Sequence, residues 1–237
     1  DMDRFPLLIK IIDAKADLSI QVHPDDAYAK VNENGSLGKT ECWYILDCAE
    51  DATLVIGHNA KTKEELADMI HQGRWSEFIR EIPVKKGDFI QIDPGTVHAI
   101  KGGILILETQ QNSDITYRVY DYDRLSNGKP RELHIEKSID VITVPAKSVE
   151  DSVIDTTNMP TDELHSLYEC EFYKVFRLEV EKKAVFEQKY PFMLMSILEG
   201  EGLLNGELVK KGDHLILPAG VGSIEVQGNL KAICSAV

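Results

Sequence analysis

The chain has 237 residues, 43% of them hydrophobic, and a formal net charge of −14 at pH 7. This length suffices for one large or two medium domains, and the negative charge excludes non-specific binding to nucleic acid or an anionic membrane, since both partners need a basic surface. The four cysteines form no CxxC pair and no apolar run is long enough to span a bilayer, which predicts reduced thiols and a cytoplasmic protein.

The first half of the chain has mostly the pattern of β-strands. Short apolar or alternating segments between turn residues predict strands at residues 7–12, 18–23, 41–47, 52–56, 89–92, 104–108 and 115–120. Residues 62–79 and 131–142 have helical spacing instead, and the first of these begins with a capping box.

A polar stretch then separates this half from a second series of strands. Residues 145–160 are rich in Ser, Thr, Asp and Asn, which predicts a linker. Five further strands are predicted after it, at residues 172–180, 193–198, 202–205, 214–217 and 230–235. Short strands at this spacing favour an antiparallel sandwich or jelly roll.

One motif occurs twice. Residues 85–95 are KKGDFIQIDPG and residues 210–220 are KKGDHLILPAG, each a tight Gly-Asp turn, a short apolar strand and a turn with Pro and Gly. Only the first copy is followed by a potential metal ligand, His98. We therefore expect a mainly β protein with two similar barrels and short helical inserts. The expected divisions are a metal-binding catalytic barrel at residues 1–144, a linker at 145–160 and a second, non-metallated barrel at 161–237.

Two histidines and a glutamate are candidate metal ligands in the first barrel. Strand alternation before His23 would place Ser19, Gln21 and His23 on the face opposite the aliphatic side chains, pointing into a cavity. Glu41 begins a later strand and His98 follows the Pro-Gly turn. Imidazole and carboxylate suit a borderline divalent ion such as zinc, and an amide oxygen can complete the shell. The alternative is that both histidines are satisfied core residues.

Four longer motifs resemble type I mannose-6-phosphate isomerases, especially the shorter bacterial form. They are SIQVHPDD from Ser19, GKTECWY from Gly38, PGTVHA from Pro94 and ETQQNSDITYRVYDYDR from Glu108. The resemblance covers essentially the whole chain and implies a zinc-dependent cupin with one Zn²⁺ per chain. Family members carry a further N-terminal segment, so we expect the chain, which starts at Asp1, to begin inside a domain and to be less stable or more prone to self-association than an extended form.

The resemblance also implies which residues bind the metal. His23, Glu41 and His98 match the zinc ligands of the family, and Gln21 lies at the position that can supply a fourth ligand. Two imidazoles, a carboxylate and an amide would leave room for water or substrate, as in a catalytic site.

Five further residues match the family's active-site positions. Arg118 matches its active-site arginine, Glu108 an acidic group beside the metal, and Lys39 a lysine that points into the pocket. Ser19 and Arg124 lie where contacts to the substrate phosphate are expected. The implied partner is therefore a small sugar phosphate, and the sequence makes no prediction of oligomeric state.

The implied reaction interconverts mannose 6-phosphate and fructose 6-phosphate by moving a proton between C2 and C1 through a cis-enediol(ate). The general base would be Glu108 or a metal-bound water, and zinc would either polarise the carbonyl or orient the substrate. Arg118 would stabilise the negative charge that develops on the sugar oxygens.

Several alternatives stay open. The chain could be a sugar-phosphate isomerase of other specificity, or a catalytically impaired or non-catalytic zinc-binding cupin fragment. Taken singly, Arg118 would pair with a neighbouring aspartate at the surface, Lys39 would be a solvated loop lysine and Glu108 a surface charge at a strand end. His58 follows an apolar run and is the most plausible false ligand.

Overall fold

The computed structural model describes residues 4–237 and divides the chain after Asp155 into two compact units. Strands dominate both units, and the four helices in the described residues are short. None of these helices is long and apolar enough to cross a membrane. All four cysteines lie in the described part of the chain and carry free thiols. The prediction of a mainly β protein with short helical inserts is confirmed.

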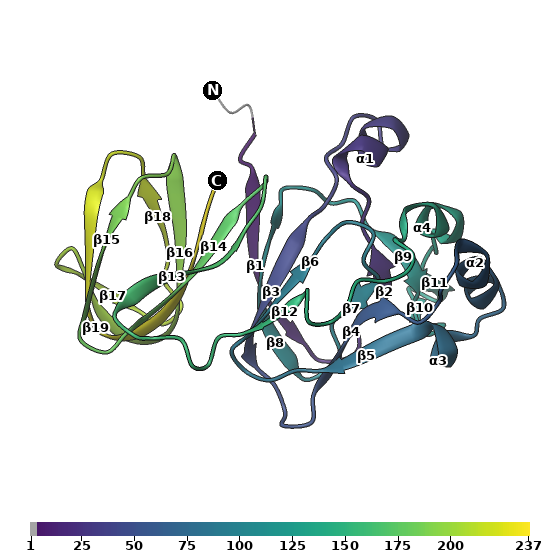
Figure 1. Cartoon of the computed structure of the whole chain (residues 1–237), viewed down its shortest axis with the longest axis horizontal. Helices are drawn as coiled ribbons and strands as arrows, with labels where there is room; N and C mark the ends of the chain where they lie inside the picture. The colour runs from purple at the N-terminus through teal and green to yellow at the C-terminus, as the bar shows by residue number, and fades with distance from the viewer. Residues whose placement is uncertain (1–3) are drawn as a thin grey trace. The chain divides into compact units, whose positions relative to one another are not determined.

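Two five-stranded antiparallel sheets form the frame of the first unit (Figure 1). One sheet has the order β1 (Leu7–Ala14), β8 (Ile104–Gln111), β3 (Glu41–Asp47), β6 (Asp88–Ile92) and β12 (Val153–Asp155). The other has the order β5 (Ile79–Pro83), β4 (Thr53–His58), β7 (His98–Ala99), β2 (Ile20–Val22) and β9 (Tyr117–Tyr120).

A hydrophobic core joins these two sheets. Trp43 and Ile45 of β3 are buried in the same cluster as Leu54 and Ile56 of β4. Each pair is two residues apart, so strand alternation turns both side chains of a pair to the same face. Glu41 lies two residues before Trp43, so it shares this face of β3 and is buried beside the core.

Helices cover the outer face of the second sheet. The helices α2 (Lys63–His71), α3 (Trp75–Phe78) and α4 (Ile135–Val141) gather at one end of the first unit (Figure 1). Leu66 of α2 and Phe78 of α3 are buried together with Ile20 and Val22 of β2. The aliphatic face predicted for β2 is therefore the one that packs against helices, which leaves the opposite face for polar residues.

The helices differ from the sequence-based predictions in extent. The predicted helix at 62–79 is broken at Gly73, which has a φ of +65°, a conformation that residues with a Cβ rarely adopt. The predicted helix at 131–142 begins only at Ile135. A further helix, α1 (Asp26–Asn32), was not predicted, although the Asp25 side chain caps it by accepting a hydrogen bond of 2.7 Å from Tyr28 N.

Both copies of the repeated motif adopt the same local structure. Lys85 N donates to Asp88 Oδ2 at 2.9 Å, and Lys210 N donates to Asp213 Oδ2 at 2.8 Å. The glycine between these residues has a φ of +89° in the first copy and +93° in the second. Each turn then enters a five-residue strand, β6 or β18 (His214–Pro218). The motif is therefore repeated in the structure as well as in the sequence.

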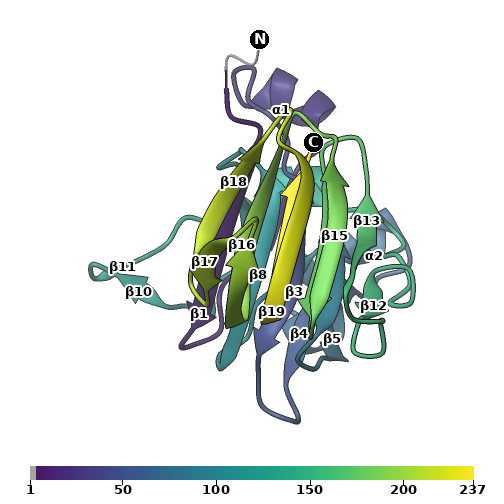
Figure 2. The same ribbon diagram turned by 90° about the vertical axis from the view of Figure 1, so that its left-hand side faces the viewer.

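The second unit is an antiparallel sheet built around two long strands, β16 (Phe192–Leu204) and β19 (Gly222–Ala236), which lie side by side (Figure 2). Their partners are β13 (Glu163–Glu169), β14 (Lys174–Val180), β15 (Lys183–Gln188), β17 (Glu207–Lys210) and β18. The strands predicted at 193–198 and 202–205 are one strand, β16, because a bulge near Ile197 lets it bend without losing its pairing to β19.

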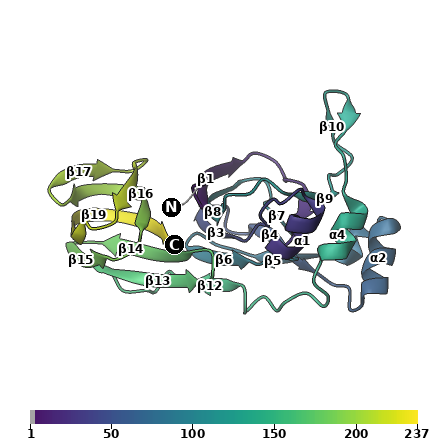
Figure 3. The ribbon, with the colours of Figure 1, turned by 90° about the horizontal axis from the view of Figure 1, so that it is seen from above.

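The polar stretch at 145–160 is not a linker over its whole length. Its residues Val153–Asp155 form β12 and pair with β6 of the first unit, so the division of the chain lies inside the predicted linker. Earlier in the chain, directly before α4, β10 (Leu125–Ser126) and β11 (Lys129–Pro130) form a hairpin that projects beside this helix (Figure 3).

Candidate metal centre

Three strands bring two histidines and a glutamate together. His23 directly follows β2, Glu41 is the first residue of β3 and His98 is the first residue of β7. Their possible ligand atoms all lie within 4.8 Å of one another, and each residue is at most 1% exposed. His23 Nε2 lies 3.4 Å from Glu41 Oε2, and His98 Nε2 lies 3.3 Å from Glu41 Oε1.

The backbone fixes the orientation of both imidazoles. His23 Nδ1 lies 2.8 Å from the carbonyl oxygen of Ile115, and His98 Nδ1 lies 2.8 Å from that of Thr96. A carbonyl can only accept, so each Nδ1 carries the proton and each Nε2 keeps a free lone pair toward Glu41. This is the tautomer that a divalent metal requires.

Burial keeps the imidazoles neutral and nearby cations keep the carboxylate ionised. Burial, opposed by Glu41, lowers the pKa of His23 to about 4, and burial also lowers the pKa of His98. For Glu41, burial alone would raise the pKa, but the positive charge of Lys39 is the largest opposing effect, and the pKa lies well below its usual range. At neutral pH the site therefore offers two neutral nitrogen ligands and one anionic oxygen ligand.

Several polar atoms of this cluster are poorly satisfied by the protein. Among the described residues, His23 Nε2 and Glu41 Oε1 are buried without a hydrogen bond, and Glu41 Oε2 has the ion pair with Lys39 Nζ at 2.6 Å but no hydrogen bond of good geometry. Buried polar atoms are costly unless something satisfies them. A divalent cation held by these atoms would do so, and imidazole with carboxylate is a donor set that zinc accepts.

Gln21 is placed to add a fourth ligand. It is the strand neighbour of His98, and its Nε2 lies 3.3 Å from His98 Nε2. The two ends of an amide are assigned from their surroundings, and the opposite assignment would present Oε1 to the same point. Gln21 therefore lies next to the cluster, and its role as a fourth ligand stays a prediction.

Lys39 and Glu108 are buried next to the cluster. Lys39 Nζ lies 2.6 Å from Glu41 Oε2 and 4.0 Å from Glu108 Oε1. Both residues are buried, Lys39 at 5% exposure and Glu108 at 4%. The interpretations of Lys39 as a solvated loop lysine and of Glu108 as a surface charge are therefore wrong.

Two residues that the sequence analysis missed hold Glu108. Trp43 Nε1 donates to Glu108 Oε2 at 3.1 Å, and Lys10 Nζ donates to Glu108 Oε1 at 2.9 Å. The Trp43 ring also meets His98 edge to face, with centroids 5.5 Å apart. Lys10 lies opposite Glu108 in the β1–β8 pairing. The one signal in the sequence was a lysine inside an otherwise apolar strand, and nothing local connects it to Glu108.

Arg118 lies on the strand next to Gln21. The two residues are partners in the β2–β9 pairing. Its Nη1 donates to the carbonyl oxygen of Glu132 at 2.8 Å, and its Nε is buried without a partner among the described residues. Burial, and then the positive charge of Arg131, lower the pKa of Arg118. The expected surface pair with an aspartate is not what the structure shows, because Asp121 pairs with Arg124 and Arg131 instead.

The two expected phosphate contacts are farther from the cluster. Ser19 is buried directly before β2. Arg124 Nη2 lies 2.5 Å from Asp121 Oδ1, and its guanidinium stacks over Tyr122 at 5.1 Å. No described contact joins Ser19 or Arg124 to His23, so the structure places these two residues beside the cluster's strands and not in the cluster itself.

The turn that carries His98 is braced from several sides. Gly95 N donates to the carbonyl oxygen of His23 at 2.9 Å, which connects the turn to the other histidine of the cluster, and Gly95 O accepts from Thr143 N at 3.0 Å.

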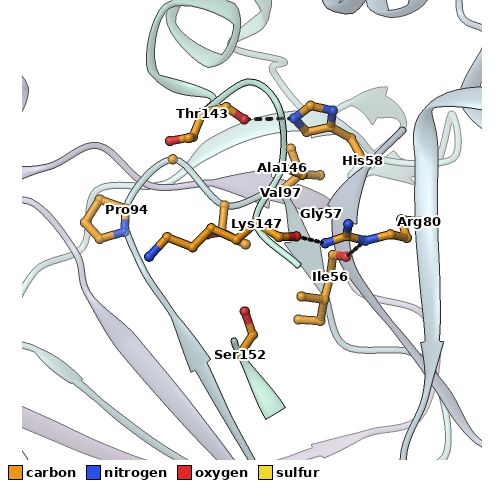
Figure 4. Close-up of a pocket in the computed structure, with 12 residues that line it drawn as sticks. Ile56, Gly57, His58, Arg80, Pro94, Val97, Thr143, Ala146, Lys147 and Ser152 are labelled. Atoms are coloured by element: carbon orange, nitrogen blue, oxygen red, sulfur yellow. Dashed lines mark hydrogen bonds between the residues drawn. The ribbon is translucent and has the colours of Figure 1, made fainter. Parts of the chain in front are cut away.

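Figure 4 shows a pocket beside this turn, in which Arg80 donates to the carbonyl oxygen of Lys147. This pocket is separate from the His-Glu-His cluster, since none of the cluster residues lines it.

His58 is not a ligand. It is 3% exposed, its Nε2 lies 3.0 Å from the carbonyl oxygen of Thr143, and its ring stacks on Phe78. Within residues 4–237, the cluster of His23, Glu41 and His98 is the one group of three such side chains close enough to hold a metal.

Comparisons with known proteins find mannose-6-phosphate isomerases, and the matched proteins cover nearly the whole chain. The family description "Mannose-6-phosphate isomerase, cupin domain" matches residues 163–237, and "Phosphomannose isomerase type I, catalytic domain" matches residues 1–46. The chain is 51% identical to mannose-6-phosphate isomerase ManA of Bacillus subtilis over 98% of its own length and 75% of that protein. It is 47% identical to mannose-6-phosphate isomerase of Streptococcus mutans, over 98% of its length and 74% of that protein.

The fold agrees as well. The crystal structure of mannose 6-phosphate isomerase from Bacillus subtilis superimposes with a TM-score of 0.88 and 44% identity, covering 100% of this chain and 77% of the other. The prediction of a cupin fold is confirmed.

Proposed function

The chain belongs to the mannose-6-phosphate isomerase family, and from this we propose that it uses zinc to interconvert mannose 6-phosphate and fructose 6-phosphate. The observation that supports this best is the buried cluster whose two imidazoles both turn a free Nε2 toward Glu41. His23, Glu41, His98 and Gln21 would hold the ion. When bound, zinc would supply a Lewis acid for the oxygen on which negative charge develops.

Isomerisation needs a base that takes the proton from C2 and returns it to C1, while a second proton passes from O2 to O1. We assign the base to Glu108. Trp43 Nε1 and Lys10 Nζ each hold one of its oxygens, so the carboxylate has a fixed orientation beside Lys39. A carboxylate held in this way is already oriented before the substrate binds, and a general base must be correctly oriented toward the proton that it removes.

The cis-enediolate between the two sugars carries negative charge on its oxygens. Arg118 would stabilise it, because its buried Nε has no partner among the described residues and Arg118 is the strand partner of Gln21. Lys39, whose Nζ lies 4.0 Å from Glu108 Oε1, would be a second donor. Ser19 and Arg124 are assigned to the phosphate. The second unit, which presents no comparable group in its described residues, would serve as scaffold.

The test is turnover in deuterium oxide with the zinc-loaded protein. Proton transfer through an enediol predicts deuterium at C1 of fructose 6-phosphate and at C2 of recovered mannose 6-phosphate, whereas a hydride shift incorporates none. Glu108→Gln should abolish both incorporation and turnover while zinc content stays at one per chain. A panel of hexose 6-phosphates decides the specificity, and absence of turnover on every member would overturn the proposal.

A further inference from the structure

A cluster of arginines surrounds one buried carboxylate at the end of β9. Asp121 is 4% exposed. Arg131 donates to it from two atoms, Nε to Oδ2 at 2.7 Å and Nη2 to Oδ1 at 2.5 Å. Arg124 donates to the same Oδ1 from Nη2 at 2.5 Å. Hydrogen bonds from Arg131, and less strongly from Arg124, lower the pKa of Asp121 to about 2, so it is ionised at neutral pH.

Asp121 fixes these two guanidinium groups without using all their donors. Arg124 Nε also donates to the backbone oxygen of Asp121, and its Nη1 to that of Asp17. Arg131 Nη1 has no partner among the described contacts and is on the far side of the fork from Asp121. A guanidinium has five N–H groups in one plane, so the bonds to Asp121 orient the unused ones.

The charges of the cluster do not cancel. Arg124 and Arg131 both pair with the single carboxylate of Asp121, so one of these two guanidinium charges is not compensated within the group. Arg118 adds a further positive charge nearby, close enough to Arg131 that, after burial, the charge of Arg131 also lowers the pKa of Arg118. A phosphate monoester carries about −1.5 to −2 at pH 7, so it has the charge that this group of arginines attracts.

The backbone is strained where it forms this cluster. Tyr122 and Asp123 both have a φ of +55°, in the left-handed region that non-glycine residues rarely occupy. This conformation turns the chain back so that Arg124 reaches Asp121, and the β10–β11 hairpin then returns Arg131 to the same carboxylate (Figure 3). Strain of this kind persists only where the surrounding contacts hold it.

The position of the cluster ties it to the metal centre. Arg118 is the strand partner of Gln21, and Gln21 is the strand partner of His98. A ligand whose reacting carbons lie at the His98 side would therefore extend along β2 and β9 toward the arginines. Neither Arg131 nor Asp121 is implied as a site residue by the sequence motifs.

We propose that Arg131 is a phosphate ligand of the substrate, acting together with Arg124, and that Asp121 is the positioning residue that holds Arg124 and Arg131 side by side. This rests on the proposed function for the identity of the sugar phosphate. The chemistry it requires is bidentate recognition of a phosphate dianion by planar guanidinium groups.

The test measures substrate affinity and phosphate affinity separately. Arg131→Ala and Asp121→Asn, both zinc-loaded, should raise KM for mannose 6-phosphate about tenfold or more with kcat changed less than about twofold, as expected for a charged hydrogen bond held equally in ground and transition states. Binding of inorganic phosphate, measured by calorimetry, should weaken in parallel. Lys129→Ala is the matched control, since it removes a positive charge from the same hairpin at an exposed position, and it should change neither quantity.

Arg131→Lys distinguishes binding from folding. Lysine keeps the positive charge but lacks the planar guanidinium with its paired N–H groups. The melting temperature of Arg131→Lys should therefore be closer to that of the wild type than the melting temperature of Arg131→Ala is, while its KM for mannose 6-phosphate should stay nearly as high as that of Arg131→Ala. If the Arg131 and Asp121 variants lower the melting temperature but leave KM and phosphate binding unchanged, the cluster only stabilises the hairpin and the proposal is wrong. If the wild-type protein binds inorganic phosphate at this cluster but turns over no hexose phosphate, the proposed function fails while the phosphate site stands.

Discussion

Replacing His98 should abolish the stabilisation that zinc confers on the first unit. His98 is fully buried and would supply one of the three proposed ligands, which come from separate strands. The three can meet only in the folded protein, so zinc held by them would bind the native state and stabilise it by mass action. At a free zinc concentration of 100 times the dissociation constant, this stabilisation is about 2.7 kcal/mol.

That free energy converts to a measurable shift in melting temperature. For a unit of roughly 150 residues, 1 kcal/mol corresponds to about 2–4 °C, so zinc should raise the transition of the wild-type first unit by about 5–11 °C. Differential scanning calorimetry with and without zinc measures this shift. In His98→Ala it should vanish, and elemental analysis should find no stoichiometric metal.

Loss of a buried ring also destabilises the metal-free protein, so absolute melting temperatures do not decide the matter. His58→Ala is the matched control, because His58 is also buried, at 3% exposure, but contacts Thr143 and lies outside the cluster. It should lower the melting temperature of the metal-free protein and leave the zinc-induced shift intact. A wild-type shift close to zero, or an undiminished shift in His98→Ala, would refute the assignment of this cluster as the metal site.

Three further outcomes follow from the same geometry. Arg118→Ala should keep zinc and lower kcat and kcat/KM together by about 10² or more, with little recovery by lysine, in steady-state assays; a change in KM alone would make it a substrate anchor. Gly95→Ala should lower stability and zinc affinity, because the new Cβ would lie 2.4 Å from Thr143 Oγ1 at a φ of +82°, whereas Gly206→Ala, at +89° in open space, should cost about 1 kcal/mol and leave zinc binding unchanged. The pKa of Asp121 lies near 2, below its unfolded value, so its ion pairs stabilise the fold above about pH 4 and are lost as pH falls toward 2; urea unfolding of wild type and Asp121→Asn should therefore differ at pH 7 and converge in acid.

The local pattern of the sequence was enough to predict which residues share a face. Alternation before His23 put Gln21 opposite Ile20 and Val22, and in the structure those two aliphatic side chains are buried against the helices while Gln21 faces His98. The period of a strand is two, so this information is contained in neighbouring residues. The shared turn of the two motif copies, at Lys85 and at Lys210, was predictable for the same reason.

Contacts between side chains that are distant in the chain could not be predicted from any short stretch of the sequence. Lys10 meets Glu108, 98 residues later, only because β1 pairs with β8 in one register, and Arg131 meets Asp121 only because a hairpin returns the chain to the end of β9. Burial also reversed the interpretation of Lys39, whose charge is tolerated inside because Glu41 lies 2.6 Å away. Pairing register and burial depend on contacts between segments far apart in the chain, and so the sequence alone determined the ligand types and their faces, while the folded sheets determined their neighbours.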